Sequence, residues 1–115
     1  MICRTWHGYA TYENADAYER VVRTVVIPGI EARSIPGFLS IDLVRRQHPD
    51  EVEFMTIMWF ESEQAIIDFV GPDATVAHVP PEARQVLARF DGHSQHYEVL
   101  DRRKQRRVNI PPDAE

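Results

Sequence analysis

The nine residues VEFMTIMWF, positions 52–60, decide the fold, because they form a strand that is apolar on both faces. Side chains of a strand point alternately to opposite faces. One parity of this run holds Val52, Phe54, Met58 and Phe60, and the other holds Met55, Ile57 and Trp59. β-Branched and aromatic residues favour a pleated strand. The run therefore predicts a strand whose two faces both need cover.

The strand before it in the chain is half-buried. In residues 38–46, Leu39, Ile41 and Leu43 alternate with polar or charged side chains, which is the period of a strand with one solvated face. Only the short turn at 48–50 separates this strand from the strand at 52–60. Two strands around so short a turn pair antiparallel, so we expect a β-hairpin.

The N-terminal part of the chain predicts a strand and then a helix. Residues 2–11 are rich in residues that favour strands. Asn14 is a suitable helix N-cap, and Pro28 is expected to end or kink the helix near Ile27. An apolar stripe at helical spacing lies between them, formed by Tyr18, Val21, Val22, Val25 and Gly29.

The C-terminal part predicts one or two helices and a last strand. Ser62 caps a helix that Gly71-Pro72 ends, and Pro81 opens a further helix that closes at Asp91-Gly92. The apolar stripe of the first is Ala65, Ile66, Phe69 and Val70, and that of the second is Ala83, Val86, Leu87 and Phe90. Residues 94–100 form the last strand.

This order of elements, β-α-β-β-α-β, predicts an α+β, ferredoxin-like fold. Right-handed crossovers place all the helices on one face of a four-stranded antiparallel sheet. The other face of the strand at 52–60 would then be an exposed apolar patch, which soluble monomers rarely show. We therefore expect a homodimer in which two sheets pack face to face, as in a dimeric α/β barrel.

Length, charge and composition exclude several classes of protein. The 115 residues suit one domain, and the net charge of −5 argues against a nucleic-acid partner. No apolar run is long enough to span a membrane, and the N-terminus has no signal-peptide core, so we expect a cytoplasmic protein with no membrane partner. The single Cys3 excludes an internal disulfide.

The last residues differ from the body of the chain. Five of the 13 Lys and Arg residues lie within 102–107. Residues 101–115 show no apolar period, so we interpret 1–100 as the domain and 101–115 as a basic, mobile tail that adds little to the core.

Several segments resemble the antibiotic biosynthesis monooxygenase family. They are residues 4–8, 37–38, 57–62, 65–66, 69–73, 77–84, 90–91 and 96–99. The resemblance spans about residues 2–100 and rests mostly on structural motifs. It implies a dimeric α/β barrel of ferredoxin-like protomers. Some members oxygenate polyketide anthrones or quinols without a cofactor, and others degrade haem.

Cofactor-free oxygenation needs a base for the substrate, donors for its anion and a cleft that excludes water. Histidine is the usual base near neutral pH, which makes His7 and His78 the candidates. Trp59 and Arg84 are candidate donors to the oxyanion, with packing and a solvated helix charge as their respective alternatives. Tyr9, which shares a strand face with His7, and Phe69 are candidate pocket residues.

The expected function is therefore a cofactor-independent monooxygenase that oxidises an electron-rich phenolic, anthrone or quinol substrate with molecular oxygen. The partners are a small aromatic substrate, oxygen and a second copy of the chain. We expect no cofactor and no metal, because His93 and His96 lack a third ligand nearby.

Two alternatives stay open. The barrel could bind a small apolar ligand without catalysis, or it could degrade haem. The haem-degrading branch pairs a His like His78 with an Asn on the first strand and a Trp on the second helix. This chain has Thr5 or His7, and Phe69, at those places, which weakens the haem hypothesis.

Overall fold

One antiparallel sheet organises the computed structural model, which describes residues 1–105. Its strands are β1 (Ile2–Ala10), β2 (Phe38–Gln47), β3 (Val52–Phe60), β4 (Arg89–Phe90) and β5 (Gln95–Glu98). The spatial order is β2-β3-β1-β4, and β5 also pairs with β1. The predicted ferredoxin-like α+β fold is confirmed, with β1 and β3 at the centre of the sheet.

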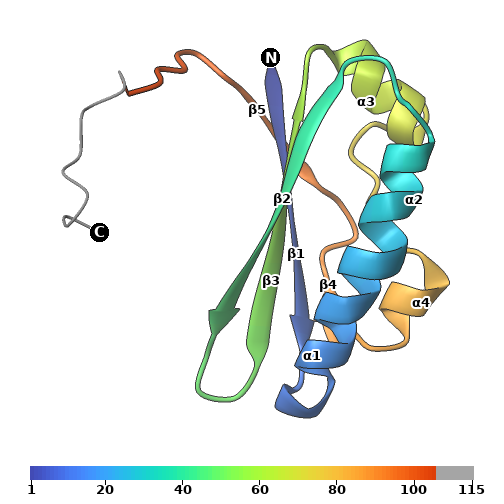
Figure 1. Ribbon diagram of the computed structural model, residues 1–115, viewed down its shortest axis with the longest axis vertical. Coiled ribbons are helices and arrows are strands. Elements are labelled where there is room, and N and C mark those ends of the chain that lie inside the picture. The colour runs from blue at the N-terminus through green and yellow to red at the C-terminus, as the bar shows by residue number, and fades with distance from the viewer. Residues whose placement is uncertain (106–115) are drawn as a thin grey trace, which may run out of the picture.

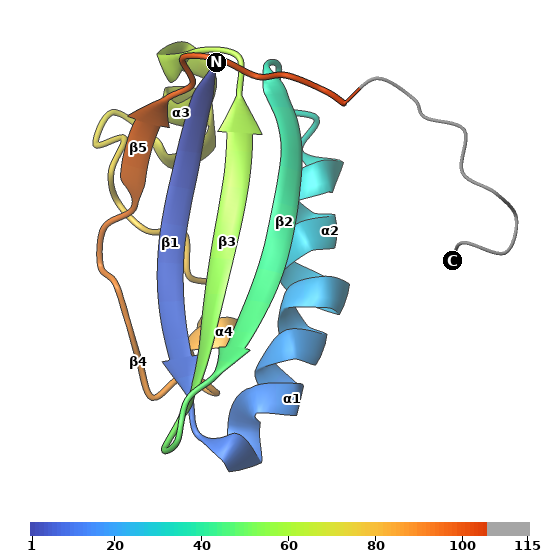
Figure 2. The same cartoon turned by 90° about the vertical axis from the view of Figure 1, so that its left-hand side faces the viewer.

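All the helices lie on the same side of this sheet. They are α1 (Tyr12–Val21), the π-helix η1 (Val22–Val26), α2 (Ile27–Ala32), α3 (Glu63–Val70) and α4 (Pro81–Arg84). Figure 1 shows them stacked along one side of the strands, and Figure 2 shows the opposite face of the sheet turned to the viewer without a helix over it. No helix within residues 1–105 is long and apolar enough to span a membrane.

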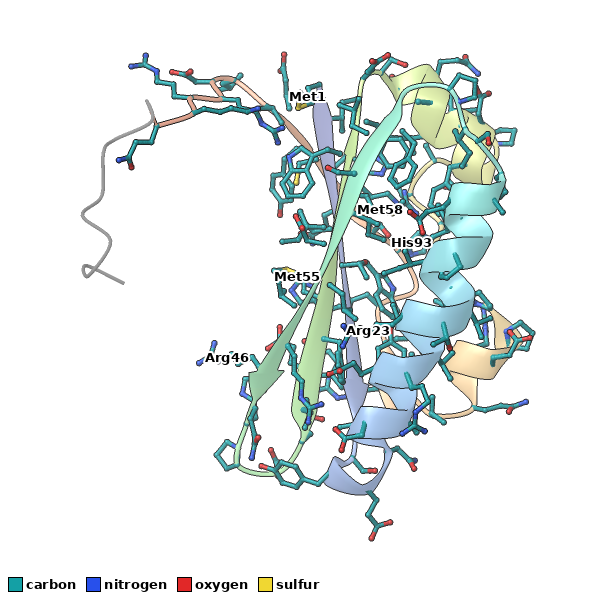
Figure 3. All side chains as sticks on the ribbon, viewed as in Figure 1. Met1, Arg23, Arg46, Met55, Met58 and His93 are labelled. Atoms are coloured by element: carbon teal, nitrogen blue, oxygen red, sulfur yellow. The ribbon has the colours of Figure 1, made fainter. Side chains whose placement is uncertain are left out.

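The two parities of β3 divide as the sequence predicts. Val52, Phe54, Met58 and Phe60 are at most 4% exposed and face the helices. Met55, Ile57 and Trp59 are half-buried on the other side of the sheet. Figure 3 shows Met58 between the sheet and the helices, and Met55 on the helix-free side. We call the surface that carries Met55, Ile57 and Trp59 the bare face.

The first helix is longer than predicted. It begins at Tyr12, where the Thr11 hydroxyl rather than Asn14 caps it by accepting from the Asn14 N–H at 3.2 Å. Of the end or kink expected near Ile27, the end is wrong, because the chain stays helical to Ala32. In the π-helical turn the Ile27 N–H donates to the Val22 carbonyl. Pro28 then falls at the start of a new α-helical segment, where a missing N–H costs little.

The predicted helix over residues 81–90 is also wrong in its second half, because α4 ends at Arg84. Beyond it the chain bonds to β1 instead: the Ala88 N–H donates to the Tyr9 carbonyl at 2.8 Å, and the Asp91 N–H to the His7 carbonyl at 3.0 Å. The stripe residues Val86, Leu87 and Phe90 still pack against the core. Their burial therefore does not need helical geometry.

The fourth position of the sheet is split between β4 and β5 rather than filled by one strand over 94–100. Between them, Gly92 and Ser94 bond to the loop before α4: Ala77 N–H donates to the Gly92 carbonyl at 3.0 Å, and Ser94 N–H to the Thr75 carbonyl at 2.7 Å. This exchange pulls residues 92–94 away from β1 and ties the loop at 75–77 to the sheet edge.

The tail leaves the sheet beside β1. Residues 101–105 are exposed, and the Arg102 guanidinium lies 5.3 Å from the centre of the Trp59 ring on the bare face. The rest of the predicted basic tail, residues 106–115, lies outside the described residues.

Candidate active site

A cavity lies between the helices and the helix-facing side of the sheet. Its free volume is about 40 Å³, room for a few water molecules, so a substrate ring requires its walls to move apart. Most of the walls are apolar, but a cation, an imidazole and hydroxyl groups also line it. The lining residues are Arg4, Trp6, Tyr18, Val22, Val26, Ile30, Ile41, Thr56, Met58, Phe69, His78, Val79, Pro80, Ala83 and Ser94.

Arg4 is the most unusual of these residues, because it is a guanidinium only 3% exposed to solvent. Its Nη1 donates to the Ala74 carbonyl at 2.5 Å and to His96 Nε2 at 2.7 Å, and its Nη2 donates to the Val76 carbonyl at 2.6 Å. Burial lowers the pKa of Arg4 to about 10, so the group stays charged at neutral pH. No carboxylate within residues 1–105 lies within 4 Å of it.

Two histidines lie beside this cation. His78 lines the cavity and is exposed to solvent, with its ring centre 5.0 Å from that of Phe69. Burial, followed by the charges of Arg33 and Arg4, lowers the pKa of His78. The pKa of His96 is lowered by burial and by Arg4, with Glu63 acting in the opposite direction. Because arginine can only donate, His96 Nε2 accepts, and the proton of the neutral ring is on Nδ1.

Two buried hydroxyl groups, in addition to the half-buried Thr56, add donors to the cavity. Tyr18 is 2% exposed and Ser94 is 5% exposed. Burial raises the pKa of Tyr18 well above its usual value, so its hydroxyl stays protonated. The indole of Trp6 is not free to bind a substrate, because its Nε1 donates to the Asp91 carbonyl at 2.7 Å. The cavity thus offers hydrogen-bond donors inside apolar walls.

The structure brings together two of the residues predicted from sequence, His78 and Phe69, in the lining of this cavity. Arg84 lies next to it without lining it. Its Nε donates to the Val79 carbonyl at 2.9 Å, and its guanidinium lies 5.2 Å from the centre of the Phe90 ring. Arg84 therefore stabilises the part of the cavity wall that Val79 forms.

The other three predicted residues, His7, Tyr9 and Trp59, point away from the cavity onto the bare face. His7 Nε2 lies 3.5 Å from Glu53 Oε2, and His7 Nδ1 lies 3.5 Å from Asp91 Oδ2. Tyr9 is covered by the Arg89 guanidinium at 3.7 Å, and Trp59 by that of Arg102. No conformation of these strands can bring the three side chains to His78, because the sheet itself lies between them.

Sequence reasoning did not select Arg4, Tyr18, Ser94 or His96 for the site. A signal for Arg4 was present, since Arg4 has the parity of Trp6, Gly8 and Ala10, which are buried on β1. A charge at a core-facing position of a central strand is rare and marks a functional or paired group. No such signal marks Ser94, whose position follows from the break between β4 and β5.

Within residues 1–105, no three His, Cys, Asp or Glu side chains gather closely enough to hold a metal ion. His96 is not available as a metal ligand, because its Nε2 accepts a hydrogen bond from Arg4 and its Nδ1 carries the proton.

Comparison with known proteins identifies the fold. No sequence-family model and no curated protein match the chain. A candidate antibiotic biosynthesis monooxygenase from Bacillus cereus superposes with a TM-score of 0.62 at 11% sequence identity, covering 93% of this chain and 98% of its own. A protein from Mycobacterium tuberculosis superposes with a TM-score of 0.55 at 14% identity, covering 90% and 98%. The chain therefore shares the fold of these structures over nearly its whole length.

Proposed function

We propose that the protein is a cofactor-independent monooxygenase of the antibiotic biosynthesis type. It oxidises an electron-rich phenolic, anthrone or quinol substrate with molecular oxygen, and it acts as a homodimer. The observation that carries this proposal is the cavity, in which a buried cation and an imidazole of lowered pKa face apolar walls. The shared fold with a candidate monooxygenase supports the same function.

His78 is the base in this proposal. Its lowered pKa keeps the ring neutral at physiological pH, ready to accept a proton. Its ring lies 5.0 Å from that of Phe69 in the cavity lining, and the residue is exposed, so the proton can pass to solvent. The apolar walls keep water from the substrate anion and leave it reactive toward oxygen.

The reaction of an anthrone illustrates the electron balance. His78 takes one proton from the CH₂ group, and the enolate gives one electron to oxygen. The carbon radical and superoxide combine into a peroxide, which takes the proton back from His78. Loss of the second hydrogen with cleavage of the O–O bond gives a carbonyl and water. One oxygen atom enters the product and the other leaves as water, so no further reductant is needed.

The bare face supports the homodimer. It carries Met55, Ile57 and Trp59 on β3 and Val44, 41% exposed, on β2. Apolar side chains at the centre of an uncovered sheet favour packing against a second sheet. A second copy of the chain offers the same surface, so the two sheets can close on each other.

The test is oxygen consumption with an anthrone or a hydroquinone, using protein stripped of metal and flavin. We expect uptake above the protein-free blank, and a loss of roughly 100-fold in turnover for His78→Ala. His7→Ala is the matched control, because His7 lies on the opposite face of the sheet and should keep full turnover.

Full activity in His78→Ala would contradict the assigned base. If no phenol supports oxygen uptake but phenols bind, the protein is better described as a binding protein for small aromatic ligands.

A further inference from the structure

We infer that Arg4 is the anion-binding residue of the cavity, and that the ligand is a planar aromatic molecule bound as its phenolate or enolate. This inference rests on the proposed function and names the group that recognises the substrate. None of the residues selected from sequence has this role.

The guanidinium is held in place before any ligand arrives. The carbonyls of Ala74 and Val76 and the Nε2 of His96 bind three of its five N–H groups. The Nε–H and the second Nη2–H have no hydrogen-bond partner within residues 1–105. Arg4 lines the cavity, so these two donors are available to an oxygen atom bound there.

The charge of Arg4 is not compensated. Its three partners are neutral, and no described carboxylate lies within 4 Å. A buried cation without a counter-ion is costly, and an anion bound beside it recovers much of that cost. The electrostatic attraction is also stronger inside apolar walls than in water.

The surrounding side chains indicate the shape of the ligand. The Phe69 ring has the Arg4 guanidinium 5.7 Å from its centre, and Met58 and Val22 are among the apolar walls. Such walls suit a flat apolar body, and a single cation suits a single negative charge. The ligand class is therefore an aromatic ring with one oxyanion.

The experiment uses 4-nitrophenol, whose phenolate is yellow and whose neutral form is colourless. The molecule is too electron-poor to be oxygenated, so it reports binding alone. We expect the wild-type protein to turn 4-nitrophenol yellow at a pH at which the free phenol is mostly colourless. 4-Nitroanisole, the matched neutral compound, should bind more weakly.

Arg4→Met should weaken phenolate binding by roughly ten- to a hundredfold, the range for hydrogen bonds to a charged group. Arg45→Met is the control and should leave binding unchanged, because Arg45 also lies over a phenylalanine ring, that of Phe54, at 5.5 Å, but is exposed and does not line the cavity. Equal binding by Arg4→Met and wild type would overturn the inference.

The wild-type comparison keeps the inference falsifiable if Arg4→Met fails to fold. Binding of 4-nitroanisole as tight as that of 4-nitrophenol would overturn it, and benzoate binding tighter than the phenolate would overturn the assigned ligand class. Oxygen uptake can fail while phenolate binding succeeds, and the reverse, so the two proposals are tested separately.

Discussion

Arg4 illustrates how one residue changes the character of a core. It occupies a buried position on the helix-facing side of β1. At other positions on that side the strand carries apolar groups, such as Trp6 and Ala10. Its guanidinium is kept there by groups from the loop after α3 and from β5, far away in sequence. The same charge lowers the pKa of both His78 and His96. Burial is the larger cause of both shifts, and the buried cation adds to it in the same direction.

Because the pKa values of His78 and His96 are lowered, we expect acid to destabilise the protein. Their folded-state pKa lies below the unfolded value of about 6.5, so the unfolded chain binds more protons in acid. Their contribution to stability is complete above roughly pH 6.5 and is lost as the pH falls through that value toward the folded pKa. The melting temperature, measured from pH 8 to 5, should fall in this window.

The double variant His78→Gln, His96→Gln should show a shallower fall over the same window. A curve parallel to that of the wild type would mean that other groups cause the acid sensitivity.

Turnover should also fall in acid. With His78 as the base and its pKa lowered, turnover should decline only below the ordinary ionisation range of histidine.

At the level of elements, β1 has its tightest glycine position at Gly8. A Cβ atom at Gly8 would lie 2.7 Å from Cη2 and 3.0 Å from Cζ3 of the Trp6 ring, and 3.2 Å from Leu87 Cδ2. The Trp6 ring cannot easily move, because its indole is bonded to the Asp91 carbonyl. The strand thus needs glycine so that the ring can lie across it.

Gly8→Ala should therefore lower the free energy of unfolding by about 1–3 kcal/mol, the cost of overpacking a core. Gly29→Ala in α2 is the control, because nothing lies within 4 Å of its Cβ position, and it should raise stability by about 0.5–1 kcal/mol. Urea unfolding of both variants measures the difference. Equal effects of the two substitutions would contradict the proposed contact.

At the scale of the whole molecule, we expect a charge to have different effects on the two faces of β3, even at adjacent residues. Ile57 lies on the bare face, and Met58, 4% exposed, lies between the sheet and the helices. Ile57→Glu should remain folded and dissociate into monomers. Met58→Glu should unfold the chain, because a charge cannot be buried there without a partner.

Sedimentation at micromolar concentration measures the outcome, with circular dichroism as the check on folding. The wild type should sediment at twice the 13.3 kDa of one chain. A wild type that stays at 13.3 kDa would contradict the homodimer, and a folded Met58→Glu would contradict the face assignment.

The sequence by itself determined the order of the elements as far as α4, the β2–β3 hairpin and the two faces of β3, because these depend on local turns and on the period of apolar residues. It also placed Phe69 and His78 near a cleft, since an apolar helix stripe and a loop after it are local features. Only the tertiary structure decided the end of α4, where the Ala88 and Asp91 N–H groups bond to β1 rather than continue a helix.

The same reason explains the site. Arg4, Ala74, Val76 and His96 come together only because β5 and the loop at 75–77 meet at the edge of β1. His7 and Trp59 are separated from His78 because alternate residues of a strand lie on opposite faces, and the choice of face depends on where the helices pack. Contacts between distant segments carry no local pattern, so this cavity and the hydrogen bonds of its buried cation follow from the folded chain alone.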